Sequence, residues 1–360
     1  MNLIKAGNRR LKKEFLKLYY RVYSGHKCNR DNFNHNAANF LYRKDSFSKN
    51  CFIEPVLVYD SGHYAARAIF LHHPLLDSLQ LGFFEALPGC RSAVDLLLEY
   101  AAVLAENLKT GRVIIGLNGH LTYGVGFLKD NYSLPAVFDG AYTPPYYPSL
   151  FSGRGFTEHE LTTYYAATAD FAPPPSLLRK INTNISYRFI RLHDLKREME
   201  ILGDLFNRTL NGTHFYFNKK IIESFEMIKM IRPLLNRRNI IYAVKEGREI
   251  GFAIWHPNFN EVLGNNRRVR PLNFFIRCKL HGAKIKDFKV NTIGVLPEYS
   301  NSGVSLGMIN EIYKQVSGVY QGGETNFVWN DNYKSSRFCA ALCRHALRRY
   351  AVYEWDLARP

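Results

Sequence analysis

Residues 294–308, GVLPEYSNSGVSLGM, have the pattern of an anion-binding loop. The apolar run VNTIGVL before the loop predicts a buried strand, and the residues after it have apolar side chains at helical spacing, namely Leu306, Ile309, Ile312 and Val316. A short loop of Ser, Asn and Gly joins the two. Because free backbone N–H groups and the positive end of a helix would meet there, the pattern favours phosphate binding. A phosphate site at this position would indicate an enzyme.

Metal chemistry is not expected from the cysteines. The six cysteines are scattered, and Cys339, Cys343 and His345 form the one group that resembles a ligand set. Two cysteines four residues apart on an apolar helix face are more typical of packing. We therefore expect no metal site and six reduced thiols, since no export signal precedes them.

Length and composition indicate the number of domains and the class of protein in which such a loop would lie. The chain has 360 residues, of which 46% are hydrophobic and 14% aromatic, so it can bury a large core and favours about two domains. The first residues, MNLIKAGNRRLKKEF, are basic without a continuous apolar stretch behind them. We therefore expect neither a secretory signal nor a transmembrane helix, and a cytoplasmic location.

The net charge of +17 is unevenly distributed. Residues 1–50 have 12 Lys/Arg against 3 Asp/Glu, residues 51–178 have 6 against 12, and residues 179–360 have 30 against 16. These segments therefore have charges of +9, −6 and +14. The distribution favours a polyanionic partner, such as RNA, an acidic carrier protein, a phosphorylated cofactor or an anionic membrane face, although a basic surface can also serve solubility alone.

Hydrophobic periodicity predicts a mixed α and β structure in the first half. Residues 8–23 have apolar side chains on one helical face, which fits a helix laid on a domain, with a membrane-surface helix as the alternative. Residues 54–73 predict a hairpin that turns at Asp60–Gly62, and residues 79–87 predict a third strand. A long helix over 92–110, ending at Gly111, precedes a buried strand at 112–119.

The second half repeats this plan, which indicates a duplicated domain. Residues 238–257 predict a hairpin turning at Glu246 and Gly247, and His-Pro follows both hairpins. After the hairpin come a strand at 290–296, the loop described above, a helix, a strand at 325–330 and a final strand near 349–355. The prolines 173–175 interrupt any helix or central strand. We therefore predict domains at 1–172 and 185–360, joined by a linker at 173–184.

The order of these elements resembles the GNAT acyltransferase fold, and the whole chain resembles the bacterial tandem-GNAT proteins of the YghO-like group. The landmarks are GFFEAL (82–87), GLNGHLTYGVGFL (116–128), TPPYYPSLFSGRGF (143–156), GREIGFAIWHPNFNEVL (247–263), GVLPEYSNSGVSLGM (294–308), ETNFVWNDN (324–332) and RRYAVYE (348–354). The resemblance implies an α/β fold of two tandem GNAT-like domains that transfers an acyl group from a thioester to an amine.

The resemblance also implies a donor site in the second domain. The strand that bonds the pantetheine arm would be Ile293, Gly294, Val295 and Leu296. The pyrophosphate loop, Arg/Gln-x-x-Gly-x-Gly/Ala in the family, would be Ser300, Asn301, Ser302, Gly303, Val304 and Ser305. Only Gly303 is fully typical, and the first position lacks its Arg or Gln. Asn332 corresponds to a later Asn that contacts the cofactor arm. The matching loop of the first domain, ALPGCRSAV, departs further, so we predict an active second domain.

Acyl transfer to an amine needs a base for the amine proton and, in many enzymes, an acid for the leaving thiolate. Candidate bases are Glu223, His256 and Glu298, and the candidate acid is Tyr350 or Tyr353. Each residue also has an ordinary structural interpretation, as a turn cap, a surface group or a core tyrosine.

The sequence is compatible with three functions. The first is an N-acyltransferase using acyl-CoA or a phosphopantetheine-linked acyl carrier protein, which a degenerate pyrophosphate loop would suit. The second is a transferase using aminoacyl-tRNA, for which the arginines of NRRNI, NNRRVRP and ALRRY would contact the RNA backbone. The third is a binding protein without activity. The acceptor would be a small-molecule or peptide amine, and contact with a membrane surface is compatible with the basic charge.

Overall fold

The chain folds into two compact α/β units. The structure is a computed structural model that describes residues 1–223, 226, 232–263, 271–343 and 345–358. The first unit comprises residues 1–161 and returns at the C-terminal residues 348–358, and the second comprises the described residues of 162–347. The proposed linker at 173–184 therefore falls inside the second unit, and the last strand belongs with the first unit from residue 348 on. Among the described residues, no helix is long and apolar enough to cross a membrane.

The first unit is built on a mixed sheet with the strand order β1-β2-β3-β4-β5-β14. Its central strands β4 and β5 are parallel, and their neighbours are antiparallel. The strands are β1 (Asn2–Lys5), β2 (Phe52–Asp60), β3 (His63–His72), β4 (Leu79–Ala86), β5 (Arg112–Ile115), β6 (Phe127–Leu128) and β14 (His345–Asp356). The helices are α1 (Arg9–Val22), α2 (Asn34–Leu41), α3 (Ser46–Lys49), α4 (Arg91–Asn107) and α5 (Tyr147–Phe151).

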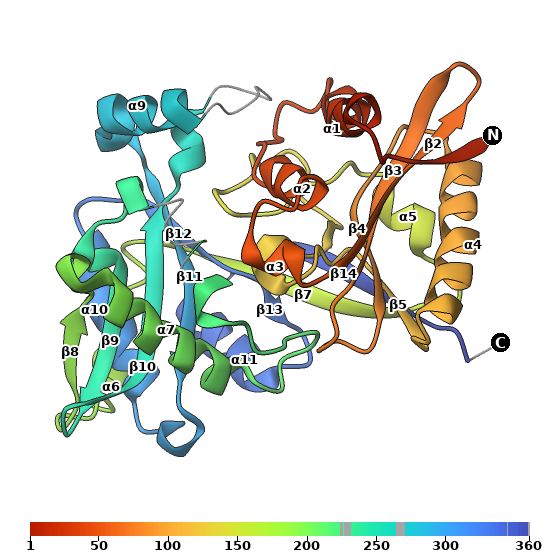
Figure 1. Cartoon of the computed structure of the whole chain (residues 1–360). Helices are drawn as coiled ribbons and strands as arrows, with labels where there is room; N and C mark the ends of the chain where they lie inside the picture. Colours follow the sequence, from red (N-terminus) through yellow and green to blue (C-terminus); the bar gives the residue numbers. More distant parts are fainter. Residues whose placement is uncertain (224–225, 227–231, 264–270, 344, 359–360) are drawn as a thin grey trace. The chain divides into compact units, whose positions relative to one another are not determined.

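Helices cover both faces of this sheet, α1 and α2 on one and α4 on the other (Figure 1). Alternation along β3 explains the division, because successive side chains of a strand point to opposite faces. Arg67 reaches the carbonyl of Phe15 in α1, whereas Phe70 packs edge-to-face on Tyr100 of α4, with ring centroids 5.4 Å apart. The apolar face of α1 is thus buried in its own unit, which favours the domain-packed interpretation of this helix over a membrane-surface helix.

The second unit repeats the design with the strand order β7-β12-β11-β10-β9-β8. Its strands are β7 (Thr157–Ala167), which begins in the first unit, β8 (Ser186–Phe189), β9 (Ile240–Lys245), β10 (Arg248–Pro257), β11 (Asp287–Val295), β12 (Gly322–Thr325) and β13 (Val328–Trp329). Its helices are α6 (Pro175–Leu178), α7 (Leu195–Leu210), α9 (Pro271–His281), α10 (Val304–Val316) and α11 (Tyr333–Cys343). Both α7 and α10 pack against β10 and β11, from opposite faces (Figure 1).

Most predicted elements are confirmed, and two predicted strands are shorter than expected. Both hairpins turn through left-handed residue pairs, Ser61–Gly62 and Glu246–Gly247, as two-residue turns require. The strand predicted at 112–119 ends at Ile115, because Gly116 takes a φ of 92° and lies against the ring of Phe127. The strand predicted at 325–330 is divided into the end of β12 and the short β13.

Candidate functional site

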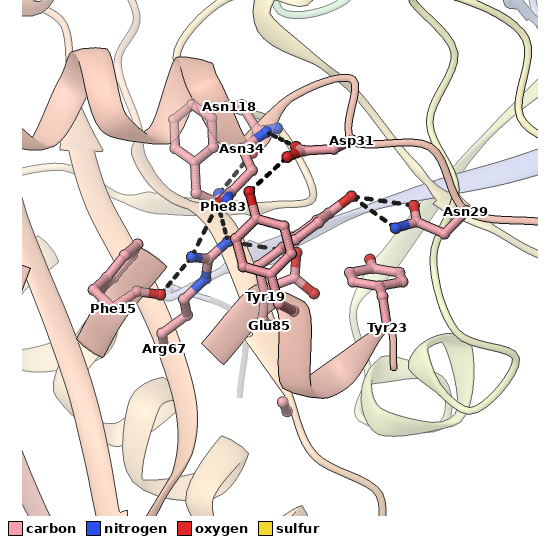
Figure 2. A network of polar contacts seen from close by, with 12 residues as sticks. Phe15, Tyr19, Tyr23, Asn29, Asp31, Asn34, Arg67, Phe83, Glu85 and Asn118 are labelled. Atoms are coloured by element: carbon pink, nitrogen blue, oxygen red, sulfur yellow. Dashed lines mark hydrogen bonds and ion pairs between the residues drawn. The ribbon is translucent and has the colours of Figure 1, made fainter. Parts of the chain in front are cut away.

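A buried ion pair occupies the centre of the first unit. Arg67 of β3 and Glu85 of β4 are register partners, and Arg67 Nη2 lies 3.6 Å from Glu85 Oε1. Arg67 also donates from Nη1 to the carbonyl of Phe15 at 2.6 Å and from Nη2 to Oδ1 of Asn34 at 3.2 Å (Figure 2). Both charged side chains are buried, so the pair depends on this polar surrounding rather than on solvent.

The carboxyl of Glu85 has a pKa close to neutral. Burial raises its pKa to about 7, while Arg67 and the hydroxyls of Tyr147 and Tyr23 act in the opposite direction by stabilising the carboxylate. Tyr147 donates to Glu85 Oε2 at 2.6 Å, and the same hydroxyl accepts from the amide N–H of Ala86 at 2.9 Å. The phenol therefore fixes the carboxyl against its own strand.

A β-bulge in β4 sets the direction of Glu85. The register between β3 and β4 shifts between the pairs Ile69–Gly82 and Arg67–Glu85, so β4 holds one extra residue in this stretch. Phe83 takes a φ of 48° there, a left-handed conformation that is rare outside glycine. A bulge turns the following side chains, and here it places Glu85 opposite Arg67 on the face that α1 and α2 cover.

The central parallel strands diverge next to the bulge. β4 and β5 pair only as far as Leu81 and Ile115. Beyond this point, the amide N–H of Phe83 donates to Oδ1 of Asn118 at 2.6 Å, and Gln80 exchanges two hydrogen bonds with the backbone of Gly119. Side-chain contacts thus replace strand pairing at the position where the two strands separate.

A cavity of about 70 Å³ lies at this divergence. It is bounded by β4, by the loop before α2 and by the segment 116–127 that follows β5. Its walls are rich in aromatic rings and include both members of the ion pair. The lining residues that matter here are Tyr19, Tyr23, Asn34, Arg67, Phe83 and Glu85. The arrangement brings a carboxyl of near-neutral pKa to a small aromatic cavity, which suits proton transfer with a polar group of a ligand.

The second unit shows the same divergence at the predicted donor strand. β11 pairs with β12 only from Asp287 to Val290, and the amide of Asn326 donates to the carbonyl of Val290 at 2.8 Å. Ile293, Gly294 and Val295 lie beyond the paired part, and Leu296 donates to the carbonyl of Ile250. The structure therefore places this strand where two parallel strands separate.

The predicted phosphate loop precedes α10 and packs against the chain's own backbone. Gly303 is the N-cap of α10 with a φ of 77°, and a Cβ added there would lie 2.1 Å from the carbonyl oxygen of Lys180. In the first unit, Gly89 has a similar φ of 76° just before α4, and a Cβ there would meet nothing within 4 Å. The loop of the second unit is thus the more enclosed of the two.

The other loop residues have local structural contacts. Ser302 donates its hydroxyl to the carbonyl of Tyr299 at 2.6 Å, and Asn301 takes a left-handed φ of 71°. Ser300 follows the short turn Pro297–Tyr299, and Val304 and Ser305 begin α10. Asn332 accepts from the amide of Ser335 at 3.1 Å and so caps α11.

The five candidate acid and base residues are divided between the two units. Tyr350 and Tyr353 are buried in β14 of the first unit, where Tyr353 lies beside Phe127 and Phe151, and the three candidate bases belong to the second unit. His256 pairs with Lys289 at the start of β11, whereas Glu298 follows its end, so roughly 20 Å of strand separates them. His256 stacks on Phe259, which fits a packing role.

Glu298 and Glu223 have separate surroundings. Glu298 is exposed and forms an ion pair with Arg208 at 3.3 Å. Glu223 is buried and accepts from the amide of Lys220 at 3.0 Å. Its negative charge acts on Lys219, whose pKa is nevertheless lowered to about 8 by burial. In the described part of the chain, no group of three or more His, Cys, Asp and Glu side chains is arranged to hold a metal ion.

Comparison with known proteins gives structural similarity alone. No protein-family model and no curated protein matches the sequence. A tandem GNAT protein from the clavulanic acid biosynthesis pathway superposes with a TM-score of 0.57 and 12% identity, covering 100% of this chain and 99% of that one. The chain has the tandem GNAT fold.

Two further GNAT structures match over nearly the whole chain. A GCN5-related N-acetyltransferase from Sphaerobacter thermophilus has a TM-score of 0.54 at 12% identity, with coverage of 99% and 96%. A probable N-acyltransferase from Enterococcus faecalis V583 has a TM-score of 0.52 at 10% identity, with coverage of 99% and 72%. The diverging central strands of both units are consistent with this GNAT fold.

Sequence reasoning missed the buried pair of the first GNAT unit. Glu85 lies in GFFEAL, which served only as a landmark, and Arg67 lies in the first hairpin. One signal was available: each of two neighbouring apolar strands has a single Asp, Glu, Lys or Arg, and the two charges are opposite. Burying such residues is costly unless they are paired, so the two strands could have been expected to place them together.

Proposed function

We propose that this chain is an N-acyltransferase that transfers an acyl group from a thioester, acyl-CoA or an acyl carrier protein, to a small-molecule or peptide amine. In this proposal, Glu85 is the general base and the cavity beside it receives the amine. The observation that carries the proposal is the buried carboxyl of Glu85, whose pKa of about 7 suits proton uptake near neutral pH. The narrower resemblance to the YghO-like group belongs to the same proposal.

We prefer the first unit to the second as the catalytic one. Its cavity and its near-neutral carboxyl occur together at the divergence of β4 and β5. The loop before α4 is open at Gly89, whereas the backbone of Lys180 packs against Gly303 at the corresponding position of the second unit. A donor phosphate on the second loop would have to approach beside that carbonyl oxygen, which repels an anion.

The proposed reaction uses Glu85 for one proton. The amine nitrogen forms a C–N bond with the thioester carbonyl carbon while Glu85 accepts the proton that the nitrogen loses. The C–S bond then breaks, and the thiolate leaves with the bonding electrons and takes a proton from water. Arg67 and Tyr147 hold the carboxyl in place throughout, and the aromatic walls exclude water from the reacting amine.

Two of the arginines named for tRNA binding have partners within the first unit. Arg348 is buried and donates to the carbonyls of Leu134 and Pro135, and Arg349 is paired with Asp130 at 2.7 Å. Both therefore stabilise the C-terminal strand within the first unit. Arg237 and Arg238 of NRRNI are exposed, and residues 265–270 of NNRRVRP lie outside the described residues.

Thiol release tests the proposal directly. The full chain is incubated with acetyl-CoA or a long-chain acyl-CoA and a panel of primary amines, and the free thiol is measured. Amine-dependent release that is lost in Glu85→Gln supports the proposal. If thiol is released equally by wild type and Glu85→Gln, Glu85 is not the base. If no donor gives thiol release or raises the Tm, the reading as a binding protein without activity replaces it.

A further inference from the structure

One helix of the second unit presents an exposed apolar ridge. In α9, Leu272, Ile276 and Leu280 are spaced four residues apart and are 71%, 47% and 71% exposed. Residues at this spacing line one face of a helix. The opposite face is anchored, because Phe274 and Cys278 are buried and Phe274 packs edge-to-face on Phe259. The ridge therefore cannot turn inward without removing these buried side chains.

The ridge is surrounded by positive charge. Between residues 271 and 286 the charged side chains are Arg277, Lys279, Lys284 and Lys286, and the sequence has no Asp or Glu in this range. All four basic residues are exposed. The nearby acid Glu261 accepts from the amides of Lys286 and Asp287 at 2.8 and 3.0 Å, so its carboxylate is engaged by the backbone. An anionic surface is the complementary partner.

We propose that α9 docks this protein on anionic lipid membranes. A single row of aliphatic side chains on a helix forms a convex ridge, which a fluid lipid interface can accept without a matching groove. Lysine and arginine beside the ridge would meet the headgroups. RNA offers no aliphatic environment for Leu272 and Leu280, so the apolar ridge favours lipid over nucleic acid. At 11 residues, α9 is too short to cross the bilayer and would lie in the interface.

α9 differs from the basic N-terminal helix α1 in how far its apolar side chains are buried. The apolar face of α1 is used within the first unit, where Phe15, Leu18, Tyr19 and Val22 are buried. The apolar residues of α9 are divided between a buried face and an exposed face. Only the second arrangement leaves large aliphatic side chains available to a partner.

Vesicle flotation of the full chain tests the proposal. Vesicles of phosphatidylcholine alone are compared with vesicles of equal parts phosphatidylcholine and phosphatidylglycerol. We expect wild type to float with the anionic vesicles and to be released by high salt. The double variant Leu272→Gln, Leu280→Gln should bind at least about tenfold more weakly, because its ridge no longer enters the interface.

Matched variants separate docking from general hydrophobicity. Val103→Gln with Val319→Gln changes two residues that are 55% and 64% exposed elsewhere, and should leave binding within about twofold. Lys279→Gln with Lys284→Gln should weaken binding to anionic vesicles only. The proposal is overturned if wild type stays in solution with both vesicles, or if the valine variant loses as much binding as the leucine variant. Binding of a purified acidic carrier protein through the ridge, without flotation, would also overturn it. Circular dichroism confirms that each variant is folded.

Discussion

Arg67 and Glu85 face each other across β3 and β4 in the interior of the first unit, with Nη2 and Oε1 3.6 Å apart. This separation exceeds that of a charge-assisted hydrogen bond, so the carboxyl obtains its closest contact from Tyr147 at 2.6 Å. Glu85 is therefore stabilised by one cation and by the hydroxyls of Tyr147 and Tyr23, and its protonation depends on all three.

Arg67→Met should destabilise the protein strongly. The change leaves Glu85 without its cation and removes the donors to Phe15 and Asn34. At pH 8, where Arg67 keeps the carboxyl ionised, its loss leaves a buried carboxyl that must take up a proton or remain an uncompensated charge. We expect a loss of ~3–5 kcal/mol in the free energy of unfolding, measured by urea denaturation. The double variant Arg67→Met, Glu85→Leu should be more stable than Arg67→Met alone.

The matched control for this prediction is Arg112→Met. Arg112 forms a partly exposed pair with Glu354 at 3.1 Å in the same unit, and a pair open to solvent on its arginine side contributes about 1 kcal/mol. Equal losses in Arg67→Met and Arg112→Met would show that the buried pair is not a stabilising centre of this unit.

The stability of the protein should depend on pH through Glu85. Burial raises its pKa from the ordinary 4.5 to about 7 in the folded state, so the folded state holds the proton more tightly. The contribution is complete below pH 4.5 and decreases as the pH rises to about 7, by roughly 3 kcal/mol in total. Glu85→Gln should lack this decrease when both proteins are unfolded in urea at several pH values. Parallel pH profiles would contradict the assignment.

Tyr147→Phe should move the pH dependence of activity to higher pH. The phenol lowers the pKa of Glu85 by donating to its carboxylate, so its loss leaves a weaker acid. We expect the midpoint of kcat/KM against pH to rise by about one unit. Tyr132→Phe, which removes a phenol bonded to the carbonyl of Leu128, is the control and should leave the midpoint in place. An unchanged midpoint in Tyr147→Phe would separate this phenol from the titrating group.

The two loop glycines should respond differently to alanine. Gly89→Ala has only the strain of a left-handed φ, about 1 kcal/mol, because the space around it is open. Gly303→Ala has the same strain and also displaces the carbonyl of Lys180, so we expect a loss of ~3 kcal/mol. Urea denaturation of both variants measures the difference. Equal losses would show that Lys180 does not press on the second loop.

Much of the fold could be predicted from local patterns in the sequence. The hairpins turning at Ser61–Gly62 and Glu246–Gly247 follow from residues that accept a left-handed φ, and α10 follows from its apolar spacing. These features depend on neighbouring residues alone. The return of β14 to the first unit could not be found in this way, because its pairing with β5 joins residues more than two hundred positions apart.

The candidate site was harder to predict for the same reason. The loop at Gly303 has a recognisable pattern, but its contact with Lys180 comes from a segment far earlier in the chain. The near-neutral pKa of Glu85 depends on burial, on the bulge at Phe83 and on residues from β3 and α5. One charged residue in an apolar strand of the sequence does not show which residues will surround it or how they will shift its pKa.

The pH profile of acyl transfer by wild type and Glu85→Gln tests the central claim most directly. Thiol release from acyl-CoA in the presence of an amine gives kcat/KM across pH 5 to 9. We predict that wild-type activity rises with a midpoint near 7, and that Glu85→Gln, folded by circular dichroism, is ~10²–10⁴-fold slower and lacks this midpoint. A Glu85→Gln variant that keeps the wild-type rate and midpoint would contradict the account.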